Sequence, residues 1–412
     1  MKRYDAYKST GIPWIPEVPE HWEVDKIRKH FKQRVEMVSD KDYPPLSVTK
    51  DGILPQLDTA VKTLYGDKRK LVLQGDYVVN SRSDRKGSCG ISPFDGSVSL
   101  INIVMPSMDG EQGYYHLLFR SNDFIEEFYR NGRGIVADLW TTRYQEMKNI
   151  EIPFPPLSEQ RAIVAYVERK GRQIDAYIAR QAEQIERLKE LRQTIISHAV
   201  TCGIHPYTRF RPTGIPWIPE VPEHWEVDKI RKHFKQRVET VSDKDYPPLS
   251  VTKDGVLPQL DTAVKTLYGD KRKLVLQGDY VVNSRSDRKG SCGISPFDGS
   301  VSLINIVMPS MDGEQGYYHL LFRSNDFIEE FYRNGRGIVA DLWTTRYQEM
   351  KNIEIPFPPL SEQRAIVAYI EKKTAAVDRM INACREQTEL MKAYKQRLIS
   401  DAVTGRIRVP EK

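Results

Sequence analysis

The strongest constraint on this chain is an internal repeat as long as a whole domain. Residues 10–166 and 213–369 align without a gap at an offset of 203 residues. They differ at only two positions, Met37 against Thr240 and Ile53 against Val256. Solenoids and repeat arrays have periods of about 20–50 residues, so this repeat is too long to be one of their units. The chain therefore contains two nearly identical globular domains, each followed by a segment of its own.

The strand signals of one copy predict a mixed α/β domain. Residues 11–22 (GIPWIPEVPEHW) are too rich in proline for a helix and predict an extended leading segment. The stretch LSVTKDGILPQL predicts two strands joined by a turn at Gly52, and KLVLQGDYVVNS predicts two strands joined at Gly75. Residues 98–106 and 147–156 each predict one further strand.

Two kinds of helix are predicted in each copy. Residues 122–132 predict a short helix that Ser121 or Asn122 caps. A long helix follows the proline-rich stretch FPP, with Ser158 as its cap and Glu159 in its first turn.

A heptad pattern of apolar residues runs through both long helices, although their sequences diverge after residues 166 and 369. A pattern that persists where surface residues have changed is expected of two helices that pack on each other. The polar residues at a and d positions either set the register of the pair or lie at solvent-exposed ends of it. Gly171 predicts a bend in the first helix. The a and d positions of the first helix are Val164, Val167, Gly171, Ile174, Ile178, Gln181, Ile185, Leu188, Arg192, Ile195 and Ala199. Those of the second helix are Val367, Ile370, Thr374, Val377, Ile381, Cys384, Thr388, Met391, Lys395, Leu398 and Ala402.

The alternative to a helix pair is that each helix lies on its own domain. Matched length and register favour the pair. If the pair is antiparallel, the identical domains lie at opposite ends of a rod with a pseudo-two-fold axis across it. A helix over residues 158–200 would be about 65 Å long. Two-fold proteins read DNA half-sites about 35 Å apart, so such a rod could hold two readers over one face of DNA.

Composition narrows the class of partner. The net charge of +6 and the pI of about 8.9 favour an anionic partner, although a plain solvated surface gives the same value. We see no run of eighteen apolar residues and no signal peptide, so we expect no membrane span. The cysteines form no C-x-x-C pair, which predicts free thiols and a cytoplasmic location. They are Cys89, Cys202, Cys292 and Cys384.

Three motifs carry a resemblance to a known family. They are GIPWIPEVPEHW at the head of each domain, PPLSEQRAIVAYVERK at the head of the first helix, and LISDAVTGRI near the end of the chain. Together with the order domain, helix, domain, helix, they resemble the specificity (S) subunit of type I restriction–modification systems over almost the whole chain. The Leu-Ser-Glu-Gln helix start is a fairly specific marker, because it occurs twice at the right places.

The resemblance implies a division of the chain into four segments. Two target-recognition domains span 1–156 and 204–359. Two helical regions span 157–203 and 360–412, the second including a C-terminal tail. The fold implied is mixed α/β (α+β), with two globular domains joined by two long antiparallel coiled-coil helices.

The resemblance also implies a function. In that family each domain reads one half of a split DNA site, while the helices act as a ruler and dock partner subunits. The implied partners are double-stranded DNA, two methyltransferase (M) subunits and, where the system has them, two restriction (R) motor-nuclease subunits. This chain would be non-catalytic and would bind no cofactor or metal, whereas S-adenosylmethionine is expected on the M subunit. The partners would carry out adenine methylation and cleavage.

The near-identity of the two domains departs from the family, whose members typically carry two different domains. The strands of DNA are antiparallel, so identical readers related by a two-fold axis should read an inverted repeat with a nonspecific gap.

Basic loops are the candidate DNA contacts, because Lys and Arg bind phosphates while Arg, Lys and Thr also reach base edges. Any one of them is equally consistent with a solvated surface residue. In the first copy the candidates are Thr49, Lys50, Arg82, Arg85, Lys86, Arg133, Thr141, Thr142, Arg143 and Tyr144. In the second copy they are Thr252, Lys253, Arg285, Arg288, Lys289, Arg336, Thr344, Thr345, Arg346 and Tyr347. Trp140 and Trp343 are predicted to be core residues rather than base-stacking ones.

Enzymatic interpretations find little support in the sequence. GRGIVA (132–137) matches G-x-G-x-x-A but ends a helix instead of linking a strand to one. FPPL (154–157) lacks the polar and aromatic residues of amino-methyltransferase signatures. No P-loop or H-E-x-x-H occurs, and no histidine has metal-ligand spacing. Cys89 in GSCG could be a nucleophile but has no local sign of activation.

Other functional classes remain open at this point. A stand-alone tandem DNA-binding protein, repressor-like and without methyltransferase partners, is the main alternative. An enzyme with unrecognised chemistry and a purely structural coiled-coil protein are the others.

Overall fold

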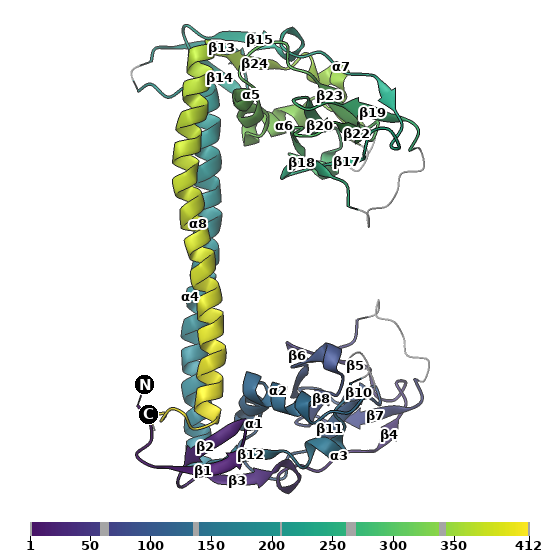
Figure 1. The fold of residues 1–412 in the computed structure, drawn as a ribbon, viewed down its shortest axis with the longest axis vertical. Coiled ribbons are helices and arrows are strands. Elements are labelled where there is room, and N and C mark those ends of the chain that lie inside the picture. Colours follow the sequence, from purple (N-terminus) through teal and green to yellow (C-terminus); the bar gives the residue numbers. More distant parts are fainter. Residues whose placement is uncertain are drawn as a thin grey trace. The chain divides into compact units, whose positions relative to one another are not determined.

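The computed structural model describes residues 2–57, 66–134, 140–206, 208–260, 269–337 and 343–410. It divides into two compact units: unit 1 comprises Met1–Gln181 with Glu386–Lys412, and unit 2 comprises Ala182–Arg385. Two sheet-rich domains are joined by the long helices α4 (Leu157–Cys202) and α8 (Leu360–Val403), as Figure 1 shows. The predicted mixed α/β class is therefore confirmed. The boundary between the units runs across both helices.

The domain of unit 1 is built from small antiparallel sheets. Two sheets have three strands, in the orders β10–β7–β4 and β11–β8–β9, and three pairs are β1–β2, β12–β3 and β5–β6. Its strands are β1 (Tyr7–Ile12), β2 (Ile15–Pro19), β3 (Glu23–Lys26), β4 (Met37–Val38), β5 (Leu46–Thr49), β6 (Gly52–Pro55), β7 (Arg69–Val72), β8 (Tyr77–Asn80), β9 (Cys89–Ile91), β10 (Gly96–Val98), β11 (Asn102–Met105) and β12 (Glu151–Phe154). Its helices are η1 (Ile27–Lys29), η2 (Ser83–Arg85), α1 (Gln112–Phe119), α2 (Asn122–Arg130) and α3 (Tyr144–Met147).

Unit 2 repeats this architecture and strand order, as the near-identity of the two sequences requires. Its strands are β13 (Phe210–Ile215), β14 (Ile218–Pro222), β15 (Glu226–Lys229), β16 (Thr240–Val241), β17 (Leu249–Thr252), β18 (Gly255–Pro258), β19 (Arg272–Val275), β20 (Tyr280–Asn283), β21 (Cys292–Ile294), β22 (Gly299–Val301), β23 (Asn305–Met308) and β24 (Glu354–Phe357). Its helices are η4 (Ile230–Lys232), η5 (Ser286–Arg288), α5 (Gln315–Phe322), α6 (Asn325–Arg333) and α7 (Tyr347–Met350).

Most of the predicted elements are present. The turn at Gly52 joins β5 to β6 in one hairpin. Gly75 has a φ of +89°, which a side chain would strain, and lies between β7 and β8. The hydroxyl of Ser121 caps α2 by accepting a hydrogen bond from the Phe124 N–H, so Ser121 rather than Asn122 is the cap.

Two predictions about element ends are wrong. Residues 98–106 are not one strand: β10 ends at Val98, and the Asn102 N–H and side chain both bond to the Ser99 carbonyl, which turns the chain into a different sheet. Ser158 is not the cap of α4, because the helix begins at Leu157. The carbonyl of Pro156 accepts from the Glu159 and Gln160 N–H groups, which is the role of a cap residue.

Two clusters of buried apolar residues hold the domain of unit 1. A small one between the sheets contains Leu46, Ile53 and Val104. The large one is rich in aromatic residues from α1 and α2, including Tyr114 and Phe124, and extends to apolar residues of both long helices. The domain and the helices therefore share one core, so they form a single folding unit.

The helices pack side by side and antiparallel within each unit. In unit 1 the first half of α4 lies along the end of α8, where Asp175 pairs with Lys395 at 2.7 Å. In unit 2 the second half of α4 lies along the start of α8, where Leu188 packs on Val377 and Ile381. Every predicted a and d position is buried or half-buried. The predicted helix pair is thus confirmed, and α4 continues through Gly171.

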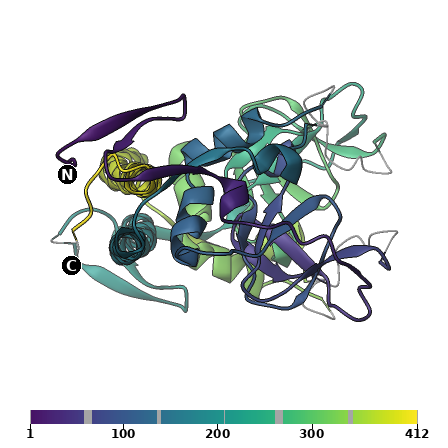
Figure 2. The same cartoon turned by 90° about the horizontal axis from the view of Figure 1, so that it is seen from below.

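One hairpin of each domain lies beside a helix. Figure 2 looks along the helices and shows β1–β2 beside α8 in unit 1 and β13–β14 beside α4 in unit 2. Trp14 and Val18 of the first hairpin belong to the same core cluster as Leu398 and Ala402 of α8. No helix in the described part of the chain is long and apolar enough to cross a membrane.

Candidate nucleic-acid interface

The loop after β8, residues 80–86, presents three cations on a fixed backbone, and we call it the basic loop. Its backbone is held by hydrogen bonds from the Tyr129 hydroxyl to the carbonyls of Asn80 and Arg85. The side chain of Arg85 is 67% exposed. Arg82 is paired with Asp84 at 3.2 Å. The loop is therefore pre-ordered, and Arg85 is its most exposed cation, with the Asp84 carboxylate 3.8 Å away.

Lys86 is the last residue of the basic loop, and its side chain contacts α2. Its ammonium pairs with Glu126 at 3.0 Å and lies 5.7 Å from the centre of the Tyr129 ring. These contacts are exposed, so they cost little to exchange for a phosphate.

A second candidate loop lies directly beside the basic loop. Arg133 and Thr141 exchange two backbone hydrogen bonds, and Arg82 forms an isolated bridge with the same Thr141. The Ser83 N–H also donates to the Trp140 carbonyl at 3.1 Å. Arg133 is 85% exposed, with Glu146 at 3.4 Å as an ion-pair partner. Arg143 is exposed as well, so the structure brings the cations of these two loops together.

The hairpin turn between β5 and β6 is tied to the same region. Arg120 donates to the carbonyls of both Lys50 and Cys89. The side chain of Lys50 is exposed, whereas the hydroxyl of Thr49 closes the turn by accepting from Asp51 N–H and donating to the Gly52 carbonyl. Arg120 was absent from the sequence-based candidates, because its role depends on two carbonyls distant in sequence.

Some candidates support the fold rather than the surface. Thr142 is fully buried, and its hydroxyl donates to the Phe128 carbonyl at 2.8 Å. Tyr144 is half-buried and donates to the Phe31 carbonyl, and burial raises the pKa of its hydroxyl. Trp140 donates its indole N–H to the Tyr129 carbonyl at 2.7 Å, in line with a structural role. Among the sequence-based candidates of unit 1, the cations with exposed side chains are Lys50, Arg82, Arg85, Lys86, Arg133 and Arg143.

Unit 2 presents the same surface from its own residues. Arg288 is 66% exposed, Arg285 pairs with Asp287 at 3.0 Å, and Lys289 pairs with Glu329 at 2.9 Å. The remaining candidates keep the contacts of their counterparts. They are Thr252 on Gly255, Lys253 in the exposed turn, Arg336 and Thr344 in a shared bridge, Thr345 buried on the Phe331 carbonyl, Arg346 exposed before α7, and Tyr347 on the Phe234 carbonyl.

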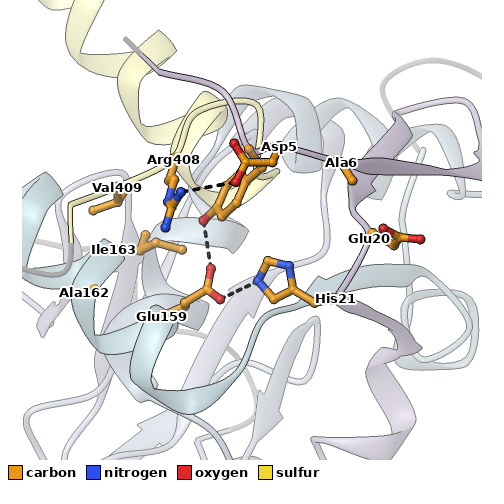
Figure 3. A pocket seen from close by; sticks show the side chains of 10 residues that line it. Asp5, Ala6, Glu20, His21, Glu159, Ala162, Ile163, Arg408 and Val409 are labelled. Carbon is orange, nitrogen blue, oxygen red and sulfur yellow. Dashed lines mark hydrogen bonds and ion pairs between the residues drawn. The ribbon is translucent and has the colours of Figure 1, made fainter.

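The repeated Leu-Ser-Glu-Gln segment joins each domain to its helix. Figure 3 shows Glu159 at the start of α4 bonded to His21, whose Nε2 lies 2.5 Å away. The same carboxylate accepts from the Trp22 indole at 3.0 Å and the Tyr4 hydroxyl at 2.8 Å. Burial by itself would raise the pKa of Glu159, but these hydrogen bonds outweigh it and lower the pKa. In unit 2, Glu362 bonds His224 and Trp225 in the same way.

Gln160 completes this joint from inside the core. It is fully buried, and its amide accepts from the Glu111 N–H and donates to the Pro155 carbonyl, both at 2.8 Å. The Glu-Gln pair therefore fixes the leading segment, α1 and α4 to one another, which explains why the motif accompanies each domain.

Cys89 lacks the exposure and the lowered thiol pKa of an activated nucleophile. It is 3% exposed, and it accepts a hydrogen bond from the Tyr77 hydroxyl at 3.3 Å. Burial raises the pKa of its thiol, which disfavours the reactive thiolate. The rejected dinucleotide motif at 132–137 lies partly outside the described residues.

Comparison with known proteins places this architecture. No family model matches the chain. A protein of Methanocaldococcus jannaschii described as the specificity subunit of the type I restriction enzyme MjaX is 22% identical over 431 residues, covering 96% of each chain. The type I restriction enzyme MjaVIII specificity subunit of the same organism is 25% identical over 430 residues, covering 95% of this chain and 94% of its own.

A solved structure shares the fold. It comes from work on complex assembly and conformational transition of the type I restriction–modification system. It covers 94% of this chain and 98% of its own length, with a TM-score of 0.63 and 16% identity.

The class that the fold defines is a protein of two similar sheet-rich domains joined by two long helices. The resemblance expected from the sequence is confirmed: over nearly its whole length, this chain is similar in sequence and fold to the specificity subunits of type I restriction–modification systems. The comparisons support DNA recognition within such a system and not a stand-alone DNA-binding protein.

Proposed function

We propose that this chain is the non-catalytic DNA-recognition subunit of a type I restriction–modification complex. The observation that carries the proposal is that each of the two repeated domains presents the same surface with an ordered basic loop. Phosphates bound by these cations would position the domain, and base edges would be read from the same loops.

The proposed site is an inverted repeat with a nonspecific gap. The two domains have the same loops, and in both units the helices pair antiparallel. Two equal readers on an antiparallel pair favour two-fold symmetry, and a two-fold protein reads a palindrome because the DNA strands are antiparallel.

The proposed partners supply the chemistry. Two methyltransferase subunits would bind this chain and methylate adenine, using S-adenosylmethionine that they hold themselves. Two restriction subunits would cleave unmodified DNA where the system has them. This chain would bind no cofactor, and its contribution is selection of the site.

A methylation map tests the proposal. The chain would be produced together with its cognate methyltransferase subunit, and modified adenines in the host DNA would be located by direct long-read sequencing. We expect one interrupted palindrome, modified on both strands. An asymmetric split site would contradict the two-fold geometry, and the absence of any site-specific modification would overturn the proposed function.

A further inference from the structure

Unit 2 contains a cleft between helix α4 and the domain. Its volume is about 490 Å³. One wall is α4, with Arg192 and Gln193. The other wall is formed by the hairpin turn between β17 and β18, the basic loop of unit 2 (residues 283–289, the counterpart of 80–86) and the helices α5 and α6. Figure 1 shows α5 lying next to the long helices, with α6 beyond it. The cleft therefore lies where the hairpin turn and the basic loop of unit 2 meet the long helix.

Four cations from four different elements line this cleft. They are Arg192 of α4, Lys253 of the hairpin turn, Lys289 of the basic loop and Arg323 after α5. The acidic residues on its walls are Asp254 and Glu329. Cations therefore outnumber carboxylates, and they face the cleft from both sides.

Three of the four cationic side chains of the cleft are either fixed by hydrogen bonds or held in ion pairs that a ligand can replace. Arg323 donates to the carbonyls of Cys292 and Lys253, so it fixes the turn that carries Lys253. Arg192 and Lys289 are paired only with partly exposed carboxylates, Asp378 at 3.2 Å and Glu329 at 2.9 Å. Such exposed pairs contribute little stability and exchange readily.

Two buried polar atoms at the cleft also lack a partner among the described residues. They are the Gln193 Oε1 and the His319 Nδ1. Burial lowers the pKa of His319 to about 4, so the ring is neutral at physiological pH and does not add to the positive charge. A buried polar atom without a partner costs free energy, so these two residues leave hydrogen-bonding capacity unused beside the cleft.

We infer that this cleft binds phosphate groups of duplex DNA, with Arg192 of the long helix as a direct contact. The inference rests on the proposed function and deepens it, because it gives α4 a role in DNA binding besides joining the domains. These contacts are sequence-independent: they add affinity and hold the duplex against the helix without specifying bases.

The test measures binding of the full chain to a labelled duplex of unrelated sequence across a range of salt concentrations. Each phosphate contact contributes about 0.9 to the slope of log affinity against log salt. We expect Arg192→Gln and Lys253→Gln each to lower this slope by about 0.9 and to weaken binding. The motif methylated with the Arg192→Gln chain should be the same as for the wild-type chain, because α4 carries none of the candidate base contacts.

Asp378→Asn is the matched control, because it breaks the same ion pair as Arg192→Gln but leaves the cation. We expect this variant to bind DNA at least as tightly as the wild type. Equal weakening by both substitutions would mean that the ion pair acts only on the helices, and an unchanged slope for Arg192→Gln would also overturn the inference. A wild-type chain that binds no DNA would instead overturn the proposed function itself.

Discussion

At the residue scale, the repeated motif has a mechanical explanation. Glu159 gathers three donors from the first 22 residues, and Gln160 satisfies two buried backbone groups from other segments. The charged carboxylate of glutamate accepts several hydrogen bonds at once on its two oxygens. The glutamine amide has the same length but only one acceptor oxygen. The contacts of this joint therefore favour Glu at position 159 and Gln at position 160 for folding, independently of DNA binding.

Glu159→Gln should destabilise unit 1 by about 2 kcal/mol at neutral pH, since hydrogen bonds to a charged group are lost and the amide NH₂ faces other donors. The pKa of Glu159 is lowered in the folded state. Its stabilisation is thus full above the ordinary glutamate pKa of about 4.3 and is lost as pH falls through the lower folded pKa.

Urea unfolding of both chains between pH 7 and pH 3 measures this. The difference between wild type and variant should shrink as the pH falls below about 4. Glu362→Gln is the control in unit 2, where the same bonds to His224 and Trp225 occur. A difference that stays constant with pH would contradict the role of the charge.

The accessible and buried site candidates could not be separated from the sequence. Basic residues between a strand and a glycine predict an exposed loop, and Arg85 and Arg288 are indeed exposed. The hydroxyl of Thr142, however, is used by the Phe128 carbonyl, fourteen residues away in sequence. A local pattern shows which residue types are present, whereas their partners depend on tertiary packing.

At the element scale, periodicity was the most informative signal. The heptads of α4 and α8 predicted which side chains would be buried, because the a and d positions of a helix pair must face the partner. Two of the polar positions are explained by cross-helix ion pairs, Arg192 with Asp378 and Lys395 with Asp175. The break inside residues 98–106 escaped prediction, since a mostly apolar run with strand composition does not reveal that Asn102 turns the chain.

Insertion of one heptad into each helix tests the ruler hypothesis. The heptads would follow Gln181 in α4 and Arg385 in α8, so that the a and d pattern continues in both. Each helix becomes about 10 Å longer, which corresponds to about three base pairs of duplex. If the helices set the spacing, the methylation map should show a longer gap with unchanged half-sites.

A heptad in α4 alone is the matched control, because it removes the match between the two helices. This single insertion should impair folding or site selection. A changed half-site sequence in the double insertion would refute the idea that the helices act only as a ruler.

At the scale of the whole molecule, the two units differ in how the end of a long helix is linked to the first strands of the domain. In unit 2 the link is covalent, and in unit 1 it consists of non-covalent contacts. In unit 2 the chain continues from the end of α4 through Gly203 into β13. In unit 1 the end of α8 is followed by a tail that returns to the start of the chain. The Arg408 N–H donates to the Lys2 carbonyl, and Figure 3 shows Arg408 beside Asp5. The sequence repeat predicted two equal domains, whereas this non-covalent closure depends on tertiary contacts.

Deleting residues 405–412 should therefore weaken unit 1 and leave unit 2 intact. The tail buries Ile407 and Val409 in the core, and the Gly405 carbonyl accepts from the Tyr7 hydroxyl at 3.0 Å. Loss of two buried aliphatic side chains costs about 3–6 kcal/mol. Hydrogen exchange should show faster exchange of backbone amides in β1, β2 and the start of α4, with no change in β13 or β14.

Arg408→Ala is the control for the charge of the tail. Its partner Asp5 is almost fully exposed, and the pair is 3.6 Å apart, so this substitution should leave exchange nearly unchanged. Equal acceleration in both units after the deletion would show that the tail stabilises the chain as a whole. Unchanged exchange in unit 1 would show that the packing of α4 and α8 against the domain holds the unit without the tail.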